Sequence, residues 1–158
     1  MDAGLLLVHG TAVALGRSAV LIRGAPGSGK SDLALRFLMQ PVDGERPPRR
    51  LVADDQVHLR RIGARIVATP PPAIRGLFEV RGIGIVAMAC IDQADLRLVV
   101  DCTARESVDR LPEPATTSLL GLAVRHARIA PFDSSAALKL LMLLENHISD
   151  PTARGDPA

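Results

Sequence analysis

The chain has 158 residues, which suits one domain with a buried core and is too short for two domains of ordinary size. It carries 19 basic and 17 acidic residues, so its formal net charge of +2 points to no particular class of partner. Trp and Tyr are absent and Phe occurs three times. The core must therefore be mainly aliphatic, and the stacking aromatics of single-stranded nucleic-acid binders are missing. We expect no nucleic-acid partner.

The sequence contains no candidate membrane segment. No apolar run reaches the roughly 18 to 20 residues that cross a bilayer, and no cationic start precedes an apolar run as in a secretory signal. Cys90 and Cys102 lack the spacing of metal ligands and are expected to be buried, inert thiols. These features predict a soluble cytoplasmic protein with one folded domain over residues 1–148. The proline-containing stretch 149–158 is expected to be a disordered tail.

The first half of the chain alternates short apolar runs with glycine and proline. Apolar runs over residues 5–9 and 19–23, with Gly10 and Gly16 between them, predict two strands joined by a tight connection. The pattern from Lys30 predicts a helix that Pro41 closes. The next predicted features are a solvated loop over 43–50, a buried strand over 51–53, and a hairpin over 57–61 and 64–68.

The second half contains further strand-like runs and one long helix. Residues 78–88 resemble a strand but carry Gly82 and Gly84, which indicates close approach of the backbone to another group. The polar stretch 105–117 predicts a mobile loop or a linker. An α/β fold follows from these elements. The remaining predictions are strands over 96–100 and 127–130 and a helix over 134–148, with Asp133 or Ser134 as N-cap and Leu138, Leu141, Met142 and Leu144 facing inward.

A glycine-rich segment joins the strand over 19–23 to the helix that starts at Lys30. Its spacing, Gly-x-x-x-x-Gly-Lys-Ser, is that of a phosphate-binding loop, or P-loop. Glycines let backbone N–H groups point at phosphate oxygens, while the lysine reaches the terminal phosphates and the serine hydroxyl ligates Mg²⁺. The segment therefore predicts binding of a purine nucleotide, ATP, with Mg²⁺. The residues expected to bind are Gly24, Ala25, Pro26, Gly27, Ser28, Gly29, Lys30 and Ser31.

Two adjacent carboxylates, Asp54 and Asp55, end the strand that follows the P-loop helix. Neighbouring side chains on a strand point to opposite faces, so the two are expected to do different work. One can orient Mg²⁺ and the other can accept a proton from an attacking hydroxyl. On the residues alone, a solvated turn or a helix cap explains the pair equally well.

Three further positions carry less information by themselves. The segment Glu79–Gly84 combines a carboxylate, Arg81 and two glycines, which a strand packed only for stability would rarely contain. His9 lies beside Gly10 after an apolar strand, where a lone histidine is more often structural than catalytic. Arg110, in the polar stretch, is by itself an ordinary surface cation.

Taken together, these features resemble the catalytic domain of HPr kinase/phosphorylase, which phosphorylates a serine of the phosphocarrier protein HPr. The P-loop is shared with many families, but the Val-Ala-Asp-Asp and Glu-Val-Arg-Gly-Ile-Gly runs together are specific, and the resemblance covers about residues 5–148. It implies an α/β P-loop domain with a mixed sheet, related to phosphoenolpyruvate carboxykinases. The segments that carry it are His9, the P-loop, Leu51-Val52-Ala53-Asp54-Asp55 and Glu79-Val80-Arg81-Gly82-Ile83-Gly84-Ile85.

The resemblance implies an ATP-dependent protein-serine kinase acting on HPr or an HPr-like carrier of the phosphotransferase system. Its catalytic residues would be His9, Lys30, Asp55 and Arg110. Asp55 would take the proton from the serine hydroxyl as that hydroxyl attacks the γ-phosphate. The domain over residues 1–148 would then be a P-loop kinase catalytic domain.

The metal ligands of the family correspond to Ser31 and Glu79, and Asp54 is expected to support the metal. The family assembles as a hexamer through its catalytic domains, so a homo-oligomer is expected. The family's long form has a further N-terminal domain, which this short form is expected to lack. Residues 43–50 resemble a short insertion, and residues 128–133 replace a Pro-Gly-Arg loop associated with phosphorolysis, so phosphorylase activity is doubtful.

Two other functions fit the same residues. One is a small-molecule kinase or carboxykinase-like enzyme. The other is a non-catalytic module that binds ATP and regulates a partner such as a sensor kinase or a phosphotransferase protein. The presence of Asp55, Glu79 and Arg81 favours catalysis over binding alone.

Overall fold

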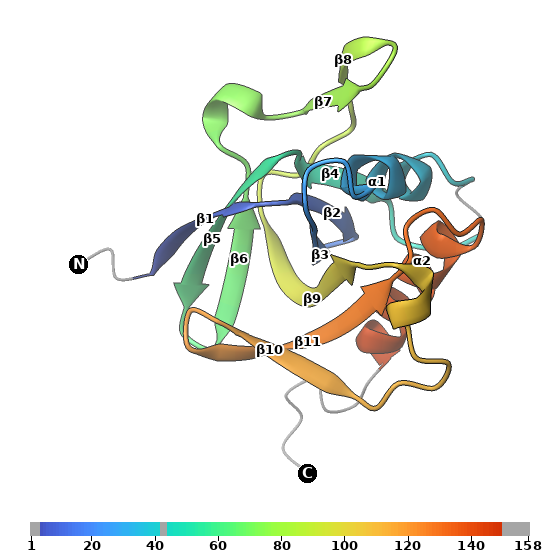
Figure 1. Cartoon of the computed structure of the whole chain (residues 1–158). Helices are drawn as coiled ribbons and strands as arrows, with labels where there is room; N and C mark the ends of the chain where they lie inside the picture. The colour runs from blue at the N-terminus through green and yellow to red at the C-terminus, as the bar shows by residue number, and fades with distance from the viewer. Residues whose placement is uncertain (1–3, 42–43, 150–158) are drawn as a thin grey trace.

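The computed structural model describes residues 4–41 and 44–149, which form a curled mixed sheet with two helices on one face and a small projecting hairpin (Figure 1). The larger sheet has the strand order β1-β5-β6-β9-β3-β2-β4, and β11 and β10 extend it from β9. Its strands are β1 (Leu5–His9), β2 (Thr11–Leu15), β3 (Ser18–Arg23), β4 (Arg49–Ala53), β5 (Gln56–Ile62), β6 (Arg65–Thr69), β9 (Ala94–Cys102), β10 (Ala115–Leu119) and β11 (Leu122–Ile129).

The remaining elements are two strands that pair only with each other, two helices and two short 3₁₀ turns. The hairpin strands stand apart from the rest of the molecule at the top of Figure 1. These elements are β7 (Leu77–Val80), β8 (Gly84–Ala87), α1 (Lys30–Leu38), α2 (Ala136–Ser149), η1 (Pro72–Ile74) and η2 (Arg105–Ser107). None of the helices in the described part of the chain is long and apolar enough to cross a bilayer.

The centre of the sheet is β9, which pairs with three other strands. It runs parallel to β3 and to β11, while β6 pairs antiparallel with its first two residues. Because parallel strands end at the same edge of a sheet, Arg23, Cys102 and Ile129 lie near one another although they are far apart in sequence. The P-loop follows β3 at this edge.

Two aliphatic cores fill the two faces of the sheet. One combines α1 and α2 with the sheet and contains Leu33, Phe37 and Leu140, all fully buried. The other contains no helix residue and includes Leu21, Val57 and Val99. The prediction that aliphatic side chains build the core is confirmed.

The expected α/β domain with a mixed sheet is confirmed, but β2, which lies next to the edge strand β4, was not predicted. β2 occupies residues 11–15, where only a tight connection was expected. Its sequence contains two alanines, which have low strand propensity, and the glycines at either side resemble a linker. The tight turn lies at Gly16, whose φ is +61°. The polar stretch 105–117 likewise contains η2 and the start of β10.

The expected inward face of the last helix is partly wrong. Leu138 and Met142 are 54% and 59% exposed, whereas Leu141 and Leu144 are buried as expected. The helix starts at Ala136, two residues later than predicted. Its buried face consists of Ala136, Ala137, Leu140, Leu141 and Leu144, which repeat at helical spacing. The predicted tail over 149–158 lies almost entirely outside the described residues.

Candidate functional site

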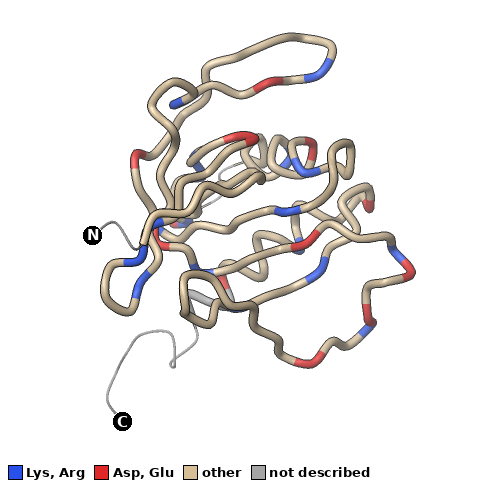
Figure 2. Tube along the Cα trace, turned by 60° about the vertical axis from the view of Figure 1, so that its left-hand side comes forward, with Lys and Arg blue, Asp and Glu red and all other residues tan. Residues whose placement is uncertain are grey.

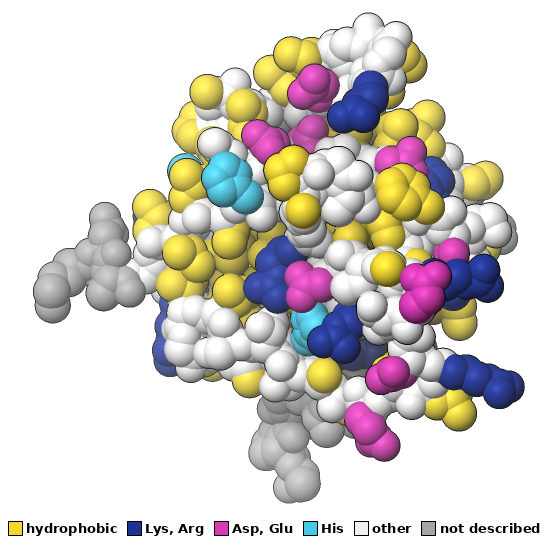
Figure 3. Space-filling model, viewed as in Figure 1, with side chains coloured by type: hydrophobic (Ala, Val, Ile, Leu, Met, Phe, Trp, Pro, Cys, Tyr) yellow, Lys and Arg dark blue, Asp and Glu magenta, His cyan; other side chains and the backbone are white. Residues whose placement is uncertain are grey.

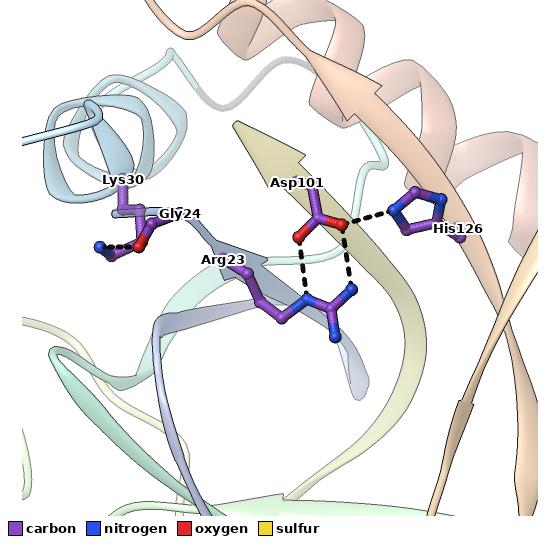
Figure 4. Close-up of polar contacts among 5 residues, drawn as sticks. All are labelled: Arg23, Gly24, Lys30, Asp101 and His126. Carbon is purple, nitrogen blue, oxygen red and sulfur yellow. Dashed lines mark hydrogen bonds and ion pairs between the residues drawn. The ribbon is translucent and has the colours of Figure 1, made fainter. Parts of the chain in front are cut away.

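The P-loop connects β3 to α1 as the sequence predicts. Ser28 N–H donates to Ala25 O at 3.0 Å and closes a turn, and Leu33 N–H donates to Gly29 O at 2.9 Å to begin the helix. The Lys30 ammonium donates to Gly24 O at 2.6 Å and Ala25 O at 3.1 Å, so it folds back over its own loop (Figure 4). Those carbonyls hold the lysine where it can turn toward phosphate oxygens.

Two glycines of the loop are packed too closely for a side chain. A Cβ on Gly24 would collide with Ser28 Oγ and lie 3.2 Å from Cys102 Cβ. Gly29 has φ +100°, and a Cβ there would lie 3.0 Å from Pro131 and 3.1 Å from the ring of Phe132. The loop between β11 and α2 therefore rests directly on the start of α1.

Arg36 of α1 binds the loop between β11 and α2 through hydrogen bonds. Its guanidinium donates to the carbonyl oxygens of Pro131 and Asp133 and forms a 2.9 Å ion pair with Asp32, one turn earlier on α1. Phe132 is 73% exposed, unlike Phe37 and Phe78, which are buried. Residues 131–132 thus border the P-loop.

Asp54 is the polar centre of the site and is 8% exposed. Its Oδ1 accepts hydrogen bonds from the hydroxyls of Thr11 and Ser31, both at 3.0 Å. Its Oδ2 accepts the backbone N–H of Glu79 at 3.3 Å. One buried carboxylate thereby joins β2, the P-loop helix and the projecting hairpin.

Asp55 is not part of the hydrogen-bonded group around Asp54. It is exposed, and its φ of 70° places a non-glycine residue in the left-handed region, a strained conformation that recurs at functional sites. Its carbonyl accepts the N–H of Gly10 at 3.0 Å, and His9 pairs with Gln56 across β1 and β5. The fold therefore brings the backbones of His9 and Asp55 together at the end of one strand pair.

The residues expected to hold Mg²⁺ meet around Asp54. The Ser31 hydroxyl and the Glu79 backbone both contact this carboxylate. Within residues 4–41 and 44–149 there is no cluster of three or more His, Cys, Asp and Glu side chains that would enclose a metal. Mg²⁺ commonly uses one or two carboxylates and completes its shell with phosphate oxygens and water. The oxygen donors at Asp54 and Ser31 fit such an open site.

Glu79 and Arg110 lie in the two segments that extend furthest from the sheet. Glu79 is on β7, and its side chain is exposed, as is Arg81 in the turn that follows. Arg110 is exposed between η2 and β10. Figure 2 shows both the hairpin and this long loop projecting from the body, each with acidic and basic positions. The fold does not bring Arg110 into a hydrogen bond with the other predicted site residues in the described part of the chain.

Three interacting polar side chains beside the P-loop were not predicted. Arg23 donates to both oxygens of Asp101, from Nε at 2.8 Å and from Nη2 at 3.0 Å. His126 Nε2 lies 2.7 Å from Asp101 Oδ2 (Figure 4). Basic, acidic and histidine side chains also gather in the middle of the face seen in Figure 3.

The surroundings of two groups shift their pKa values. Burial raises the pKa of Asp101, but hydrogen bonds and charges from Arg23 and His126 outweigh it, so its pKa lies below the ordinary value. Burial raises the pKa of the Cys102 thiol to about 11, although Lys30 opposes this. Cys102 therefore stays a neutral thiol at physiological pH, as expected of an inert cysteine.

A sequence signal existed for part of this missed group. Arg23 and Asp101 are polar residues that end apolar strands, and parallel neighbours bring such ends together. Thr11, which donates to Asp54, gave no such signal, because it lies in the strand that was not predicted.

Comparison with known proteins identifies similar sequences over nearly the whole chain. A family model described as HPr Serine kinase C-terminal domain matches residues 3–150. HPr kinase/phosphorylase of Leptothrix cholodnii is 35% identical over an alignment of 135 residues, and the match covers 77% of this chain and 39% of that protein. HPr kinase/phosphorylase of Bordetella petrii is 31% identical over an alignment of 150 residues, and the match covers 87% of this chain and 46% of that protein.

A solved structure has the same fold. The HPr(Ser) kinase/phosphatase from Coxiella burnetii aligns with a TM-score of 0.76 and 23% sequence identity, covering 91% of each chain. This likeness supports the architecture alone. The chain spans less than half the length of the two relatives above.

Proposed function

The chain belongs to the HPr serine kinase C-terminal domain family, and on this premise we propose that it transfers the γ-phosphoryl group of ATP to a serine hydroxyl of HPr or an HPr-like phosphocarrier. The names of its relatives support this class of reaction. Phosphoryl transfer depends mainly on positioning and charge neutralisation, which a P-loop between β3 and α1 can provide.

The different surroundings of Asp54 and Asp55 carry the proposal. Asp54 is buried and accepts hydrogen bonds from Thr11, Ser31 and the Glu79 backbone. Asp55, the next residue, is exposed. An exposed carboxylate is accessible to the hydroxyl of a protein substrate, whereas a buried carboxylate that already accepts three hydrogen bonds is not. We therefore assign positioning to Asp54 and proton transfer to Asp55.

In the proposed reaction, the backbone N–H groups of the P-loop and Lys30 hold the phosphates. Lys30 leaves the carbonyls of Gly24 and Ala25 to contact the terminal phosphates. The serine oxygen attacks the γ-phosphorus, its proton passes to Asp55, and the bond from the γ-phosphorus to the bridging oxygen of ADP breaks. His9 lies beside Asp55 on the adjoining strand, and Arg110 would approach with the loop before β10.

Ser31, Asp54 and Glu79 are the residues that would hold Mg²⁺, which, when bound, neutralises charge on the phosphates. The hydroxyl and carboxylate oxygens of Ser31 and Asp54 already lie 3.0 Å apart. Glu79 would turn its exposed carboxylate toward them from β7.

Substitution of the two aspartates tests the proposal. Asp55→Asn keeps the shape of the side chain but removes the proton acceptor, so transfer from radiolabelled ATP to purified HPr should fall by roughly 10²-fold or more. ATP affinity, measured by calorimetry, should change by less than about threefold, because the exposed Asp55 is assigned neither to phosphate binding nor to Mg²⁺ binding. Asp54→Asn should weaken both.

Glu45→Gln is the matched control, since Glu45 is an exposed acid in the loop before β4. It should leave transfer and ATP binding unchanged. Transfer at the wild-type rate by folded Asp55→Asn protein would refute the role of Asp55. Failure of the wild-type protein to phosphorylate HPr while it still binds ATP would refute the choice of substrate.

We further propose that the active unit is an oligomer. The projecting β7–β8 hairpin leaves Ile83 77% exposed and Ile85 71% exposed, an arrangement that favours burial against another chain. Light scattering should show a species larger than the 16.7 kDa chain at working concentration. An active, strictly monomeric protein would contradict this.

A further inference from the structure

A charged cavity lies at the opposite end of the sheet from the P-loop. It has a volume of about 520 Å³, within the range of small-molecule sites. Arg17 precedes β3 and Asp95 lies at the start of β9, and Asp95 N–H donates to Arg17 O at 2.8 Å. The P-loop follows the other end of β3, six residues or about 20 Å away. This cavity is therefore separate from the site around Asp54.

Four arginines from four separate segments line this cavity, which we call the arginine cavity. Two acidic residues also line it. Arg65 pairs with Asp95 at 3.2 Å, and Arg75 pairs with Asp92. Neither Arg17 nor Arg50 has an acidic partner among the described residues. The lining therefore carries two positive charges that no carboxylate of the lining balances. Its charged residues are Arg17, Arg50, Arg65, Arg75, Asp92 and Asp95.

The incomplete hydrogen bonding of Arg50 is a second observation that favours an anionic ligand in the arginine cavity. It is half-buried on β4, and its Nη2 donates to Gly16 O at 3.1 Å. Its Nε is buried without a hydrogen-bond partner among the described residues. A partly buried guanidinium bonded only to a neutral carbonyl is costly, because desolvation of the cation is poorly offset.

We propose that the arginine cavity binds a small organic or inorganic anion carrying two phosphate or carboxylate groups. Two such groups balance the charges of Arg17 and Arg50. Planar guanidinium groups bind phosphate and carboxylate oxygens in pairs, and this favours arginine over lysine in such sites. Arg65 and Arg75, held by their aspartates, line the walls. The inference does not rest on phosphoryl transfer at the P-loop.

Nuclear magnetic resonance of the 16.7 kDa chain can test the cavity separately from the P-loop. The ¹⁵N-labelled protein is titrated with inorganic pyrophosphate and, in a second arm, with citrate at constant ionic strength. Saturable shifts of the amides of residues 90–95 and of the Arg17 and Arg50 Nε–H groups are expected with at least one probe. Pyrophosphate alone would identify a phosphate site, and citrate alone a carboxylate site. P-loop amides serve as an internal record of binding there.

Arg17→Gln should weaken binding at residues 90–95 by at least about tenfold while P-loop shifts persist. Arg17 is exposed, so this variant is expected to fold, and Arg50→Gln provides a second test. Arg60→Gln is the control, because Arg60 is an exposed arginine on β5 that does not line the cavity. An absence of saturable shifts with either probe up to about 10 mM would overturn the proposal. Equal weakening by Arg17→Gln and Arg60→Gln would also overturn it.

Discussion

Gly27 and Gly29 of the P-loop allow the effect of backbone strain on stability to be distinguished from the effect of steric crowding. Both have positive φ, +75° at Gly27 and +100° at Gly29, but a Cβ on Gly27 meets nothing within 4 Å, whereas one on Gly29 meets Pro131 and Phe132. Gly27→Ala should lower the free energy of unfolding by about 1 kcal/mol through strain alone. Gly29→Ala should lower it by about 2–4 kcal/mol and abolish ATP binding, because crowding adds to strain. Urea unfolding of the two variants measures this difference, and equal losses would show that the contact with residues 131–132 is unimportant.

Asp101 gives the site a predicted pH dependence of stability. Its pKa is lower in the folded protein than its ordinary value, so its ionised form stabilises the fold above about pH 4. That contribution is lost as the pH falls through the lowered folded value. Asp101→Asn should therefore lower the free energy of unfolding at pH 7 by about 1 kcal/mol, since the group is partly exposed. The gap between variant and wild type should narrow as the pH falls below about 4 in urea unfolding, and a gap independent of pH would contradict this origin.

At the scale of single residues, the sequence predicts what kind of chemistry a residue performs better than it predicts which residues contact one another. The P-loop spacing and the Asp54-Asp55 pair were recognisable because each lies in one short segment. The partners of Asp54 come from three distant segments, through Thr11, Ser31 and Glu79. Only the fold brings these together, so a periodicity argument could not choose between the two aspartates.

At the scale of elements, α2 provides a matched pair of leucines. Leu140 is fully buried in the core that α2 shares with α1, while Leu138 is 54% exposed. Leu140→Ala should lower the free energy of unfolding by about 2–5 kcal/mol, because it removes buried methyl groups and leaves a cavity. Leu138→Ala should change it by less than about 0.5 kcal/mol. Chemical denaturation of both variants decides this, and comparable losses would mean that α2 packs through another face.

The elements that the sequence predicts well are those with strong local patterns. β3, α1, β5 and β6 each join a clear apolar pattern to a glycine or proline boundary. β2 was missed because its five buried residues include two alanines between two glycines. The inward face of α2 was assigned partly wrongly because almost every residue from Leu138 to Leu144 is apolar, so the periodicity did not single out one face.

At the scale of the whole molecule, the candidate site is a product of strand order. β3, β9 and β11 are parallel and adjacent, so their ends place Arg23, Asp101 and His126 in contact next to the P-loop. The sequence predicted a mixed sheet only through the family resemblance, since periodicity does not give strand order. This is why the P-loop was predicted and the charged group beside it was not.

The charges around the P-loop also bear on the direction of the proposed reaction. Phosphorolysis requires inorganic phosphate to bind next to a phosphoserine, so cations and N–H donors must offset the repulsion between them. The stretch expected to replace the family's Pro-Gly-Arg loop places Pro131 and Phe132 against Gly29 and contains the carboxylate of Asp133. Asp133 lies 3.9 Å from Arg105 and 3.8 Å from Lys139, so it draws two nearby cations to itself.

We therefore predict that this protein works much better as a kinase than as a phosphorylase. Phosphate-dependent release of pyrophosphate from serine-phosphorylated HPr should be at least about tenfold slower than ATP-dependent phosphorylation of HPr, both measured at millimolar phosphate. Asp133→Asn removes one negative charge and frees Arg105 and Lys139, so it should raise the rate of phosphorolysis by about two- to fivefold with little effect on the forward rate. Glu45→Gln, in the loop before β4, is the control for general charge and should change neither rate. Comparable forward and reverse rates in the wild-type protein would show that residues 131–133 do not set the direction of the reaction. Other cations at this edge of the sheet would then have to offset the repulsion between phosphate and phosphoserine. Arg23 and Arg128 are the nearest in the strand register, because both pair with Asp101.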